Sequence, residues 1–232
     1  LGAVDAAVGG KTGINFNGLK NEIGAFAPAI AVLIDSNFFQ TLDRTHWLSG
    51  YAEMLKHALL DSPVALDKIL GFDLNDVDYP QLNDLLFESV GVKERIVEED
   101  PTEQGIRKAL NLGHTFGHAF ESLSHELKRP HSHGYAVAWG LVCELYLSLM
   151  KWNFDQKDLM KVARFVKEHY GAFAFDCSHY PRMYELMQHD KKNESSAVNF
   201  TLLRAVGDIA INQTAGKEEL EEVLDFYRDF FY

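Results

Sequence analysis

The chain contains a pair of histidines spaced for joint binding, His114 and His118, within the segment Asn111-Leu-Gly-His-Thr-Phe-Gly-His118. On a helix, residues four positions apart lie on one face, one turn apart, so the two imidazoles could share a ligand. A catalytic divalent metal usually takes three protein ligands from histidine and carboxylate and keeps one position open. An isolated His-x-x-x-His motif more often packs or caps a helix end, so a metal site needs a third ligand from elsewhere. His131 and His133 follow after a short break in the chain.

Further polar residues lead into this segment at helical spacing. Glu103, Arg107 and Asn111 recur every four residues before His114. One continuous stretch therefore presents an acid, a guanidinium, an amide and two imidazoles, a set that indicates a binding site rather than a solvated surface.

Glu53 and Lys56 lie three residues apart in a helical pattern, where the ordinary interpretation is a solvated ion pair of small energy. Both residues are flanked by core-type side chains, so a carboxylate that points inward would require a partner such as a metal ion. Lys93 lies near an apolar stripe and either extends along its edge to solvent or reaches into a site.

The segment Gly9-Gly-Lys-Thr-Gly13 resembles a phosphate-binding loop only superficially, because that motif needs a glycine where this chain has Asp5. What remains is a glycine-rich turn whose N–H groups could face an anion, with Lys11 supplying charge, or a turn without any ligand. Gly18-Leu-Lys-Asn21 repeats the combination of a glycine, a cation and an amide.

The cations that fall within core-forming segments suggest a small anionic ligand, because the protein as a whole is acidic. They are Lys11, Lys20, Lys56, Lys93, Arg107 and the pair Lys191-Lys192. A phosphorylated or carboxylated small substrate fits this set. Glu53, His114 and His133 would then supply the two-histidine, one-carboxylate ligands of a catalytic zinc site.

The pattern of apolar residues predicts a mainly helical fold. Residues 1–28 are glycine-rich and polar, and residues 29–35 read as a short buried strand of an α/β unit. Two stretches around Gly207 predict a hairpin, residues 198–204 and 208–212. Helices are expected from residue 43 to Ser62-Pro63 and near 81–97, 114–127, 134–152, 156–169, 181–188 and 217–230.

Composition narrows the class of protein. The 232 residues are 47% hydrophobic, enough for one large domain or two small ones. A net charge of −12 argues against a broad nucleic-acid surface. The longest apolar run, residues 136–150, is interrupted by Glu144 and is too short to cross a bilayer. Two cysteines, Cys143 and Cys177, favour a reducing, cytoplasmic setting.

Several blocks together resemble bacterial 3-dehydroquinate synthases of the shikimate pathway in order and spacing. The blocks are residues 5–15, 18–21 with 23–26, 50–56, 111–121, His133-Gly134 and Asp190-Lys-Lys192. The resemblance implies a dehydroquinate synthase-like helical domain with a small hairpin over residues 43–232. It implies that residues 1–42 are the remnant of an α/β NAD-binding domain with the glycine-rich substrate loop.

The resemblance also implies roles for individual residues. Zinc or cobalt would be held by Glu53, His114 and His133, whereas His118 would serve the substrate. Lys56, Lys93, Arg107 and Asn111 would join His118 in catalysis. The remaining substrate contacts would come from Asp5, Lys11, Asn21, Glu103 and one of Lys191 or Lys192. Lys20, Thr41 and Leu42 would lie toward NAD.

The implied reaction converts 3-deoxy-arabino-heptulosonate 7-phosphate to 3-dehydroquinate and phosphate, with NAD regenerated in each turnover and a homodimer as the implied assembly. This chain has Tyr135 where the family commonly has glutamate. It begins with Leu1, without a starting methionine or a signal peptide, and the run of glycines that binds the NAD pyrophosphate is not in it. We therefore expect a fragment that cannot catalyse the whole reaction alone.

Three other interpretations remain open at this stage. Sugar-phosphate cyclases that form inosose or valiolone share the metal ligands and much of the framework. A metal-dependent polyol dehydrogenase would use the same ligands but release NADH with its product. A non-catalytic helical docking module would need none of the aligned polar residues.

Overall fold

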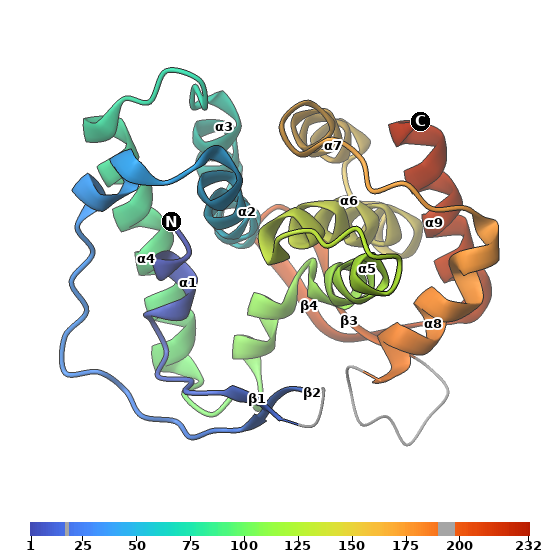
Figure 1. Cartoon of the computed structure of the whole chain (residues 1–232), viewed down its shortest axis with the longest axis horizontal. Helices are drawn as coiled ribbons and strands as arrows, with labels where there is room; N and C mark the ends of the chain where they lie inside the picture. The colour runs from blue at the N-terminus through green and yellow to red at the C-terminus, as the bar shows by residue number, and fades with distance from the viewer. Residues whose placement is uncertain (17–18, 190–197) are drawn as a thin grey trace.

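The computed structural model describes residues 1–16, 19–189 and 198–232, with the side chains of residues 15–22 and 189 outside that description. Most of these residues are helical, and the hairpin expected near the carboxyl end is present (Figure 1). The predicted fold, mainly α with a small hairpin, is confirmed.

The first part of the helical body consists of α2 (Arg44–Asp61), α3 (Pro63–Gly71) and α4 (Tyr79–Glu99). Helix α2 begins after Asp43, whose carboxylate accepts a hydrogen bond from the backbone N–H of His46. The sequence pattern predicts only a helix end at Ser62-Pro63, whereas the structure has a further helix, α3, that begins there. Ser62 caps the new helix by accepting a hydrogen bond from Ala65 N, and Pro63 occupies its first turn, where proline is tolerated.

The second part is built around α6 (His133–Trp152), which packs against α2, α5 (His114–Glu126), α7 (Gln156–Tyr170) and α9 (Lys217–Phe231). Figure 1 shows α6 near the centre of the molecule, next to α5. Helix α8 (Tyr180–His189) packs against α5 and α9. The residues of α6 are apolar on nearly every face because helices and a strand surround it.

The hairpin joins β3 (Val198–Ala205) to β4 (Asp208–Ala215) through Val206 and Gly207. Gly207 has a φ of +85°, which a two-residue hairpin turn requires and which glycine adopts without strain. Its N–H donates to the Leu59 carbonyl at 3.0 Å, so the turn is attached to α2. Strand β3 packs on α6.

The first 42 residues form smaller elements: α1 (Ala3–Ala6), a β1–β2 hairpin (Ile14–Phe16 and Leu19–Ile23) and the 3-10 helix η1 (Ser36–Thr41). The strand predicted over residues 29–35 is wrong. Residues 31–35 have no strand partner among the described residues, and Ile30 and Leu33 are 108% and 95% exposed. An apolar run becomes a strand only where another edge supplies its hydrogen bonds.

Candidate metal and substrate site

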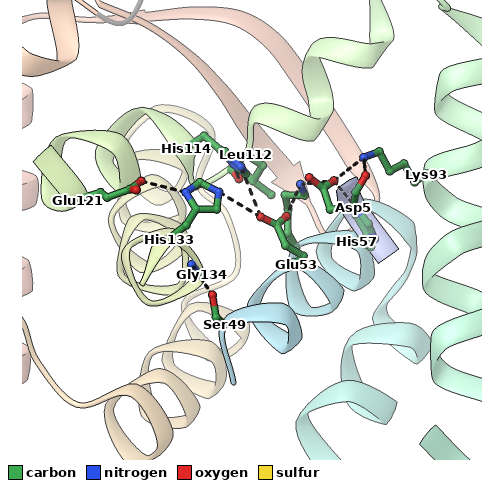
Figure 2. A network of polar contacts seen from close by, with 12 residues as sticks. Asp5, Ser49, Glu53, His57, Lys93, Leu112, His114, Glu121, His133 and Gly134 are labelled. Atoms are coloured by element: carbon green, nitrogen blue, oxygen red, sulfur yellow. Dashed lines mark hydrogen bonds and ion pairs between the residues drawn. The ribbon is translucent and has the colours of Figure 1, made fainter. Parts of the chain in front are cut away.

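Three helices bring Glu53, His114 and His133 together. Glu53 lies on α2, and the two histidines are the first residues of α5 and α6. Oε1 of Glu53 lies 3.6 Å from Nε2 of His114 and 3.5 Å from Nε2 of His133. Figure 2 shows the three side chains pointing toward one another. Residues far apart in the sequence thus converge on one point.

These spacings suit a divalent metal ion. Ligand atoms about 2.0–2.1 Å from a tetrahedral zinc ion lie about 3.3–3.4 Å from each other, close to the observed separations. Oε2 of Glu53 is buried and has no hydrogen bond from the described residues, although Lys56 Nζ lies 2.6 Å away as an ion-pair partner. A buried carboxylate with unused capacity and two imidazole nitrogens facing it form a donor set that fits zinc or cobalt.

The outer nitrogens of both histidines have acceptors that fix the tautomer. His114 Nδ1 lies 3.0 Å from the Leu112 carbonyl oxygen, and His133 Nδ1 lies 3.0 Å from Oε2 of Glu121. A proton held on Nδ1 leaves Nε2 of each ring free to bind a cation. The carboxylate behind His133 comes from α5, two turns after His114, a role that the sequence pattern did not indicate.

Burial and charge make the two histidines different. Burial, with the positive charge of Lys56, lowers the pKa of His114 to about 3, so its ring is neutral at pH 7. Burial also opposes the charged form of His133, but hydrogen bonds to Glu121 and Glu53 outweigh it and raise its pKa to about 9. Burial would raise the pKa of Glu53, but Lys56 and the histidines hold it well below its usual range. A carboxylate and a neutral imidazole are the protonation states that a metal needs.

His118 lies beside this group. Its ring centroid is 5.4 Å from that of His114 and 5.7 Å from that of His133. Each of the three rings has a nitrogen that lies within 4.8 Å of a nitrogen of the other two. The three histidines therefore lie close enough together to hold a metal ion as well. The assignment of His118 to the substrate stays a prediction.

A second cluster surrounds Asp5 of α1. Its Oδ1 lies 2.7 Å from Lys93 Nζ, 3.6 Å from Lys56 Nζ and 3.8 Å from His57 Nε2. Lys93 also donates to the Asp5 carbonyl oxygen. Burial acts against the Asp5 carboxylate, but Lys56 and Lys93 outweigh it and hold its pKa at about 2. Because Lys56 contacts both Asp5 and Glu53, the cluster is continuous with the proposed metal ligands (Figure 2).

His57 also belongs to this cluster, although it is not among the site residues predicted from the sequence. It is fully buried, its Nδ1 lies 2.8 Å from Ser89 Oγ, and its Nε2 has no hydrogen-bond partner among the described residues. Burial, with the charge of Lys56, lowers its pKa to about 3. Its position four residues after Glu53 was a usable signal, because that spacing places both side chains on one helix face.

A third group involves the glycine-rich turn. Lys11 forms an ion pair with Glu103, whose Oε1 accepts a hydrogen bond from Asn111 Nδ2 at 3.2 Å. Arg107, only 1% exposed, donates to the carbonyl oxygens of Gly9 and Pro101 at 2.7 and 2.5 Å. In this structure Arg107 therefore holds the turn against the 3-10 helix η2 (Ile106–Asn111).

The structure does not describe the side chains of four of the remaining predicted residues. Lys191 and Lys192 lie outside the described residues, and Lys20 and Asn21 lie in β2 with side chains outside the description. Thr41 ends η1 and donates to the Phe38 carbonyl, and Leu42 follows it. Among the described residues, the hydrogen bonds of Thr41 and Leu42 go to Phe38 and Phe39 and not to any of the three groups above.

Close helix crossings hold the ligand-bearing helices. Gly134, next to His133, donates its N–H to Ser49 Oγ of α2 at 3.0 Å, and a Cβ at this position would lie 1.9 Å from the Ser49 carbonyl oxygen. Tyr135, at the position where the family commonly has glutamate, packs its ring against Trp139 and Tyr170. The carboxylate that contacts His133 Nδ1 is that of Glu121.

Two models of known protein families together match residues 1–193 of the chain. The family described as 3-dehydroquinate synthase C-terminal matches residues 50–193, and the one described as 3-dehydroquinate synthase N-terminal matches residues 1–49. The two matches meet inside α2, and the domain boundary between residues 42 and 43 stays a prediction. Among the described residues, no helix is both long and apolar enough to cross a membrane.

Curated relatives agree with these matches. The chain is 58% identical to a 3-dehydroquinate synthase of Parabacteroides distasonis over 231 residues, which is 100% of this chain and 65% of that protein. It is 36% identical to the enzyme of Staphylococcus saprophyticus over 99% of this chain and 64% of that protein. The chain thus spans slightly less than two thirds of the length of these relatives.

Solved structures show the same fold. A 2-epi-5-epi-valiolone synthase from Streptomyces hygroscopicus subsp. jinggangensis, with NAD+ and Zn2+ bound, superposes with a TM-score of 0.82 at 25% identity over 98% of this chain and 64% of that one. A 2-deoxy-scyllo-inosose synthase complexed with carbaglucose-6-phosphate, NAD+ and Co2+ gives 0.81 at 19% identity over 96% and 62%. With both family matches covering residues 1–193, the chain belongs to the 3-dehydroquinate synthase family.

Proposed function

We propose that this chain carries the metal- and substrate-binding part of a 3-dehydroquinate synthase. The reaction would convert 3-deoxy-arabino-heptulosonate 7-phosphate to 3-dehydroquinate and phosphate, with NAD and a divalent metal as cofactors. The observation that carries the proposal is the convergence of Glu53, His114 and His133 in a chain 58% identical to a curated enzyme of that name. The phosphate-eliminating, lyase class of the reaction belongs to the same proposal.

Glu53, His114 and His133 would hold zinc or cobalt, the metals named with the two solved cyclases. When bound there, the ion would supply Lewis-acid polarisation of a substrate oxygen. The neutral ring of His114 and the ionised carboxylate of Glu53 are ready for binding at pH 7, whereas His133 must release a proton first.

Lys56 and Lys93 would have different tasks. Burial disfavours the charge of Lys56, but Asp5 and Glu53 outweigh it and raise its pKa, so Lys56 stays cationic and suits a substrate anion. Burial lowers the pKa of Lys93 despite its contact with Asp5, so Lys93 gives up a proton more readily. Asp5, ionised between them, would orient substrate hydroxyls as a hydrogen-bond acceptor.

Arg107, Asn111, Glu103 and Lys11 would form the outer wall of the substrate site. Arg107 already donates to two backbone carbonyls, so its direct contribution to substrate binding would come from its remaining N–H groups, including Nε, which has no partner among the described residues. His118 would face the substrate beside the metal. NAD would approach Lys20, Thr41 and Leu42. A cytoplasmic location and a homodimer complete the proposal.

Another sugar-phosphate cyclase activity is the second candidate, because the superposed structures are valiolone and inosose synthases. The sequence identity to these is 25% and 19%, against 58% to a dehydroquinate synthase. That difference favours the heptulosonate substrate.

A chimeric protein tests the proposal, because the rest of a related enzyme would supply the NAD-binding part. This chain replaces the matched 231 residues of the Parabacteroides distasonis enzyme, and the product is assayed for phosphate release and dehydroquinate with the heptulosonate phosphate, sedoheptulose phosphate and glucose 6-phosphate. We expect turnover of the first substrate alone, without net NADH. Turnover of either of the other sugars instead would favour the second candidate. Net NADH would indicate a polyol dehydrogenase.

The matched control is the same chimera with Glu53→Gln, which keeps the shape of the side chain and removes its charge. We expect loss of turnover together with loss of bound metal. A chimera that folds, binds NAD and metal, and processes none of the three sugars would contradict the proposed function.

A further inference from the structure

Glu144 is a fully buried carboxylate in the middle of α6. Its Oε2 accepts a hydrogen bond from Gly113 N at 2.6 Å, and its Oε1 accepts from Thr115 N at 3.0 Å and Phe116 N at 3.3 Å. All three donors belong to the start of α5, the helix whose first residue is His114. The Glu144 side chain therefore accepts hydrogen bonds from the residues directly before and after His114, a proposed metal ligand.

Helix α5 has no cap of its own. Its N-cap position is Gly113, with a φ of +79° and no side chain to accept a hydrogen bond. The first N–H groups of any helix lack internal partners, and the helix dipole favours negative charge there. Glu144 supplies the acceptors and the negative charge from a neighbouring helix.

The same contact links two ligand-bearing helices. Helix α6 carries His133 at its start and Glu144 three turns later, whereas α5 carries His114. The helices touch at Gly140, where a Cβ would lie 2.0 Å from the Gly113 carbonyl oxygen. Glu144 lies one turn beyond this contact on α6. Its hydrogen bonds therefore set how the start of α5 sits against α6.

The contact continues to the hairpin. Ser148 Oγ donates to the Glu144 carbonyl at 2.7 Å and accepts from Leu203 N of β3 at 3.1 Å. Ser148 is as buried as Glu144, yet its hydrogen bonds reach β3 and not α5. Glu144 and Ser148 are therefore a matched pair: both are buried on α6, but Glu144 binds α5 whereas Ser148 binds the hairpin.

We propose that Glu144 is a positioning residue for the metal centre: it fixes the orientation of His114 relative to His133 by holding the start of α5. This inference rests on the proposed function, because it assumes that the two histidines bind a metal. Residues that orient a metal ligand through hydrogen bonds to its side chain change metal affinity about 10–100-fold when they are lost, and we take the lower end for Glu144, which acts through the backbone on both sides of His114.

The test compares Glu144→Gln with Ser148→Ala in the 232-residue chain. Glutamine keeps the size of the side chain but places an NH2 donor against backbone donors, so it can satisfy only part of the set. Affinity for Co2+ is measured by competition with a chelator, and the ligand geometry by the visible absorption spectrum of bound Co2+. If the ligands around Co2+ change in number or arrangement, its visible absorption spectrum differs from that of the parent chain. A general loss of protein stability does not change the spectrum of the Co2+ that remains bound.

We expect Glu144→Gln to bind Co2+ at least about ten-fold more weakly with an altered spectrum. Ser148→Ala should keep both the affinity and the spectrum of the parent chain. If Glu144→Gln does not fold, Glu144→Asp decides, because its carboxylate is one methylene too short to reach all three donors and should also weaken binding.

The outcomes separate the two claims. Unchanged affinity and spectrum in a folded Glu144 variant would overturn the positioning role and leave the metal site intact. Equal losses in Glu144→Gln and Ser148→Ala would also overturn it, since the effect would then be general. Failure of the parent chain to bind Co2+ would overturn the metal site itself and, with it, the inference.

Discussion

The helical body from residue 44 onward and the segment of residues 8–42 are built in opposite ways. In the body, helices cross so closely that glycines are required at the contacts, as Gly134 and Gly140 show. In the segment, apolar residues such as Ile30 and Leu33 face outward. The proposed metal ligands all come from the body. The metal ligands, whose spacing must be accurate to within an ångström, therefore lie on helices that cross closely. The segment contributes mainly the glycine-rich turn, which Arg107 contacts.

The largest effect should come from breaking one of these crossings. Gly134→Ala places a Cβ 1.9 Å from the Ser49 carbonyl oxygen, so α2 and α6 must separate. We expect the free energy of unfolding to fall by about 3 kcal/mol or more, measured by urea denaturation. The control is Gly91→Ala in α4, where nothing lies within 4 Å, and it should be neutral or stabilising by about 0.5–1 kcal/mol. Equal effects of the two changes would refute the importance of the crossing.

Removing a proposed ligand should have the next largest effect. His114→Ala takes away one of three ligands, so zinc affinity should fall more than about 100-fold, beyond the range for outer-shell partners. Competition with a chelator measures it. His131→Ala serves as the control, because His131 packs against Trp139 and Phe173 rather than Glu53. Comparable losses in the two variants would show that binding does not depend on this set.

The body should also show a pH dependence from His57. Burial, with the charge of Lys56, lowers its folded-state pKa to about 3, against about 6.5 when unfolded, so the unfolded chain binds an extra proton between these values. This contribution of His57 to the free energy of unfolding is retained well above pH 6.5 and is lost as the pH falls toward 3. Between pH 6.5 and 5 the free energy of unfolding should fall by about 2 kcal/mol.

His57→Asn isolates that contribution. Urea denaturation at several pH values should give the parent chain a steeper loss of stability between pH 6.5 and 5 than the variant. Parallel curves would show that His57 does not titrate in this way.

The smallest effect is expected in the segment. Ile30→Ala removes a side chain that is 108% exposed, so the free energy of unfolding should change by less than about 0.5 kcal/mol. Ile69→Ala, the same change at a residue only 4% exposed, should cost about 2–5 kcal/mol. A large loss at Ile30 would erase the contrast between the two regions.

Helix positions were predictable because apolar periodicity and capping residues are local. The ends of α5, α6 and α9 match expectation within one residue. The apolar run at residues 29–35 misled because a strand depends on a partner edge, which the run itself does not specify. Ser62 and Pro63 signal both a stop and a start, and only the stop was recognised.

The site was predictable in part. His114 and His118 follow from spacing. The approach of Glu53 to His133 depends on long-range packing, so residue chemistry and the family resemblance could suggest this ligand set, but no local pattern could. Glu121, His57 and Glu144 were missed as supporting residues. Glu144 in particular interrupts an apolar run, and nothing in the sequence shows that its partners are the N–H groups of another helix.

The most direct test of the metal site is anomalous diffraction at the zinc absorption edge from crystals of this chain grown with zinc. We predict a peak bounded by the Glu53 carboxylate and Nε2 of His114 and His133, about 2.0–2.2 Å from each. A peak instead among Asp5, Glu53 and His57, the other carboxylate–imidazole group of the described structure, would contradict this account, as would the absence of any peak at saturating zinc.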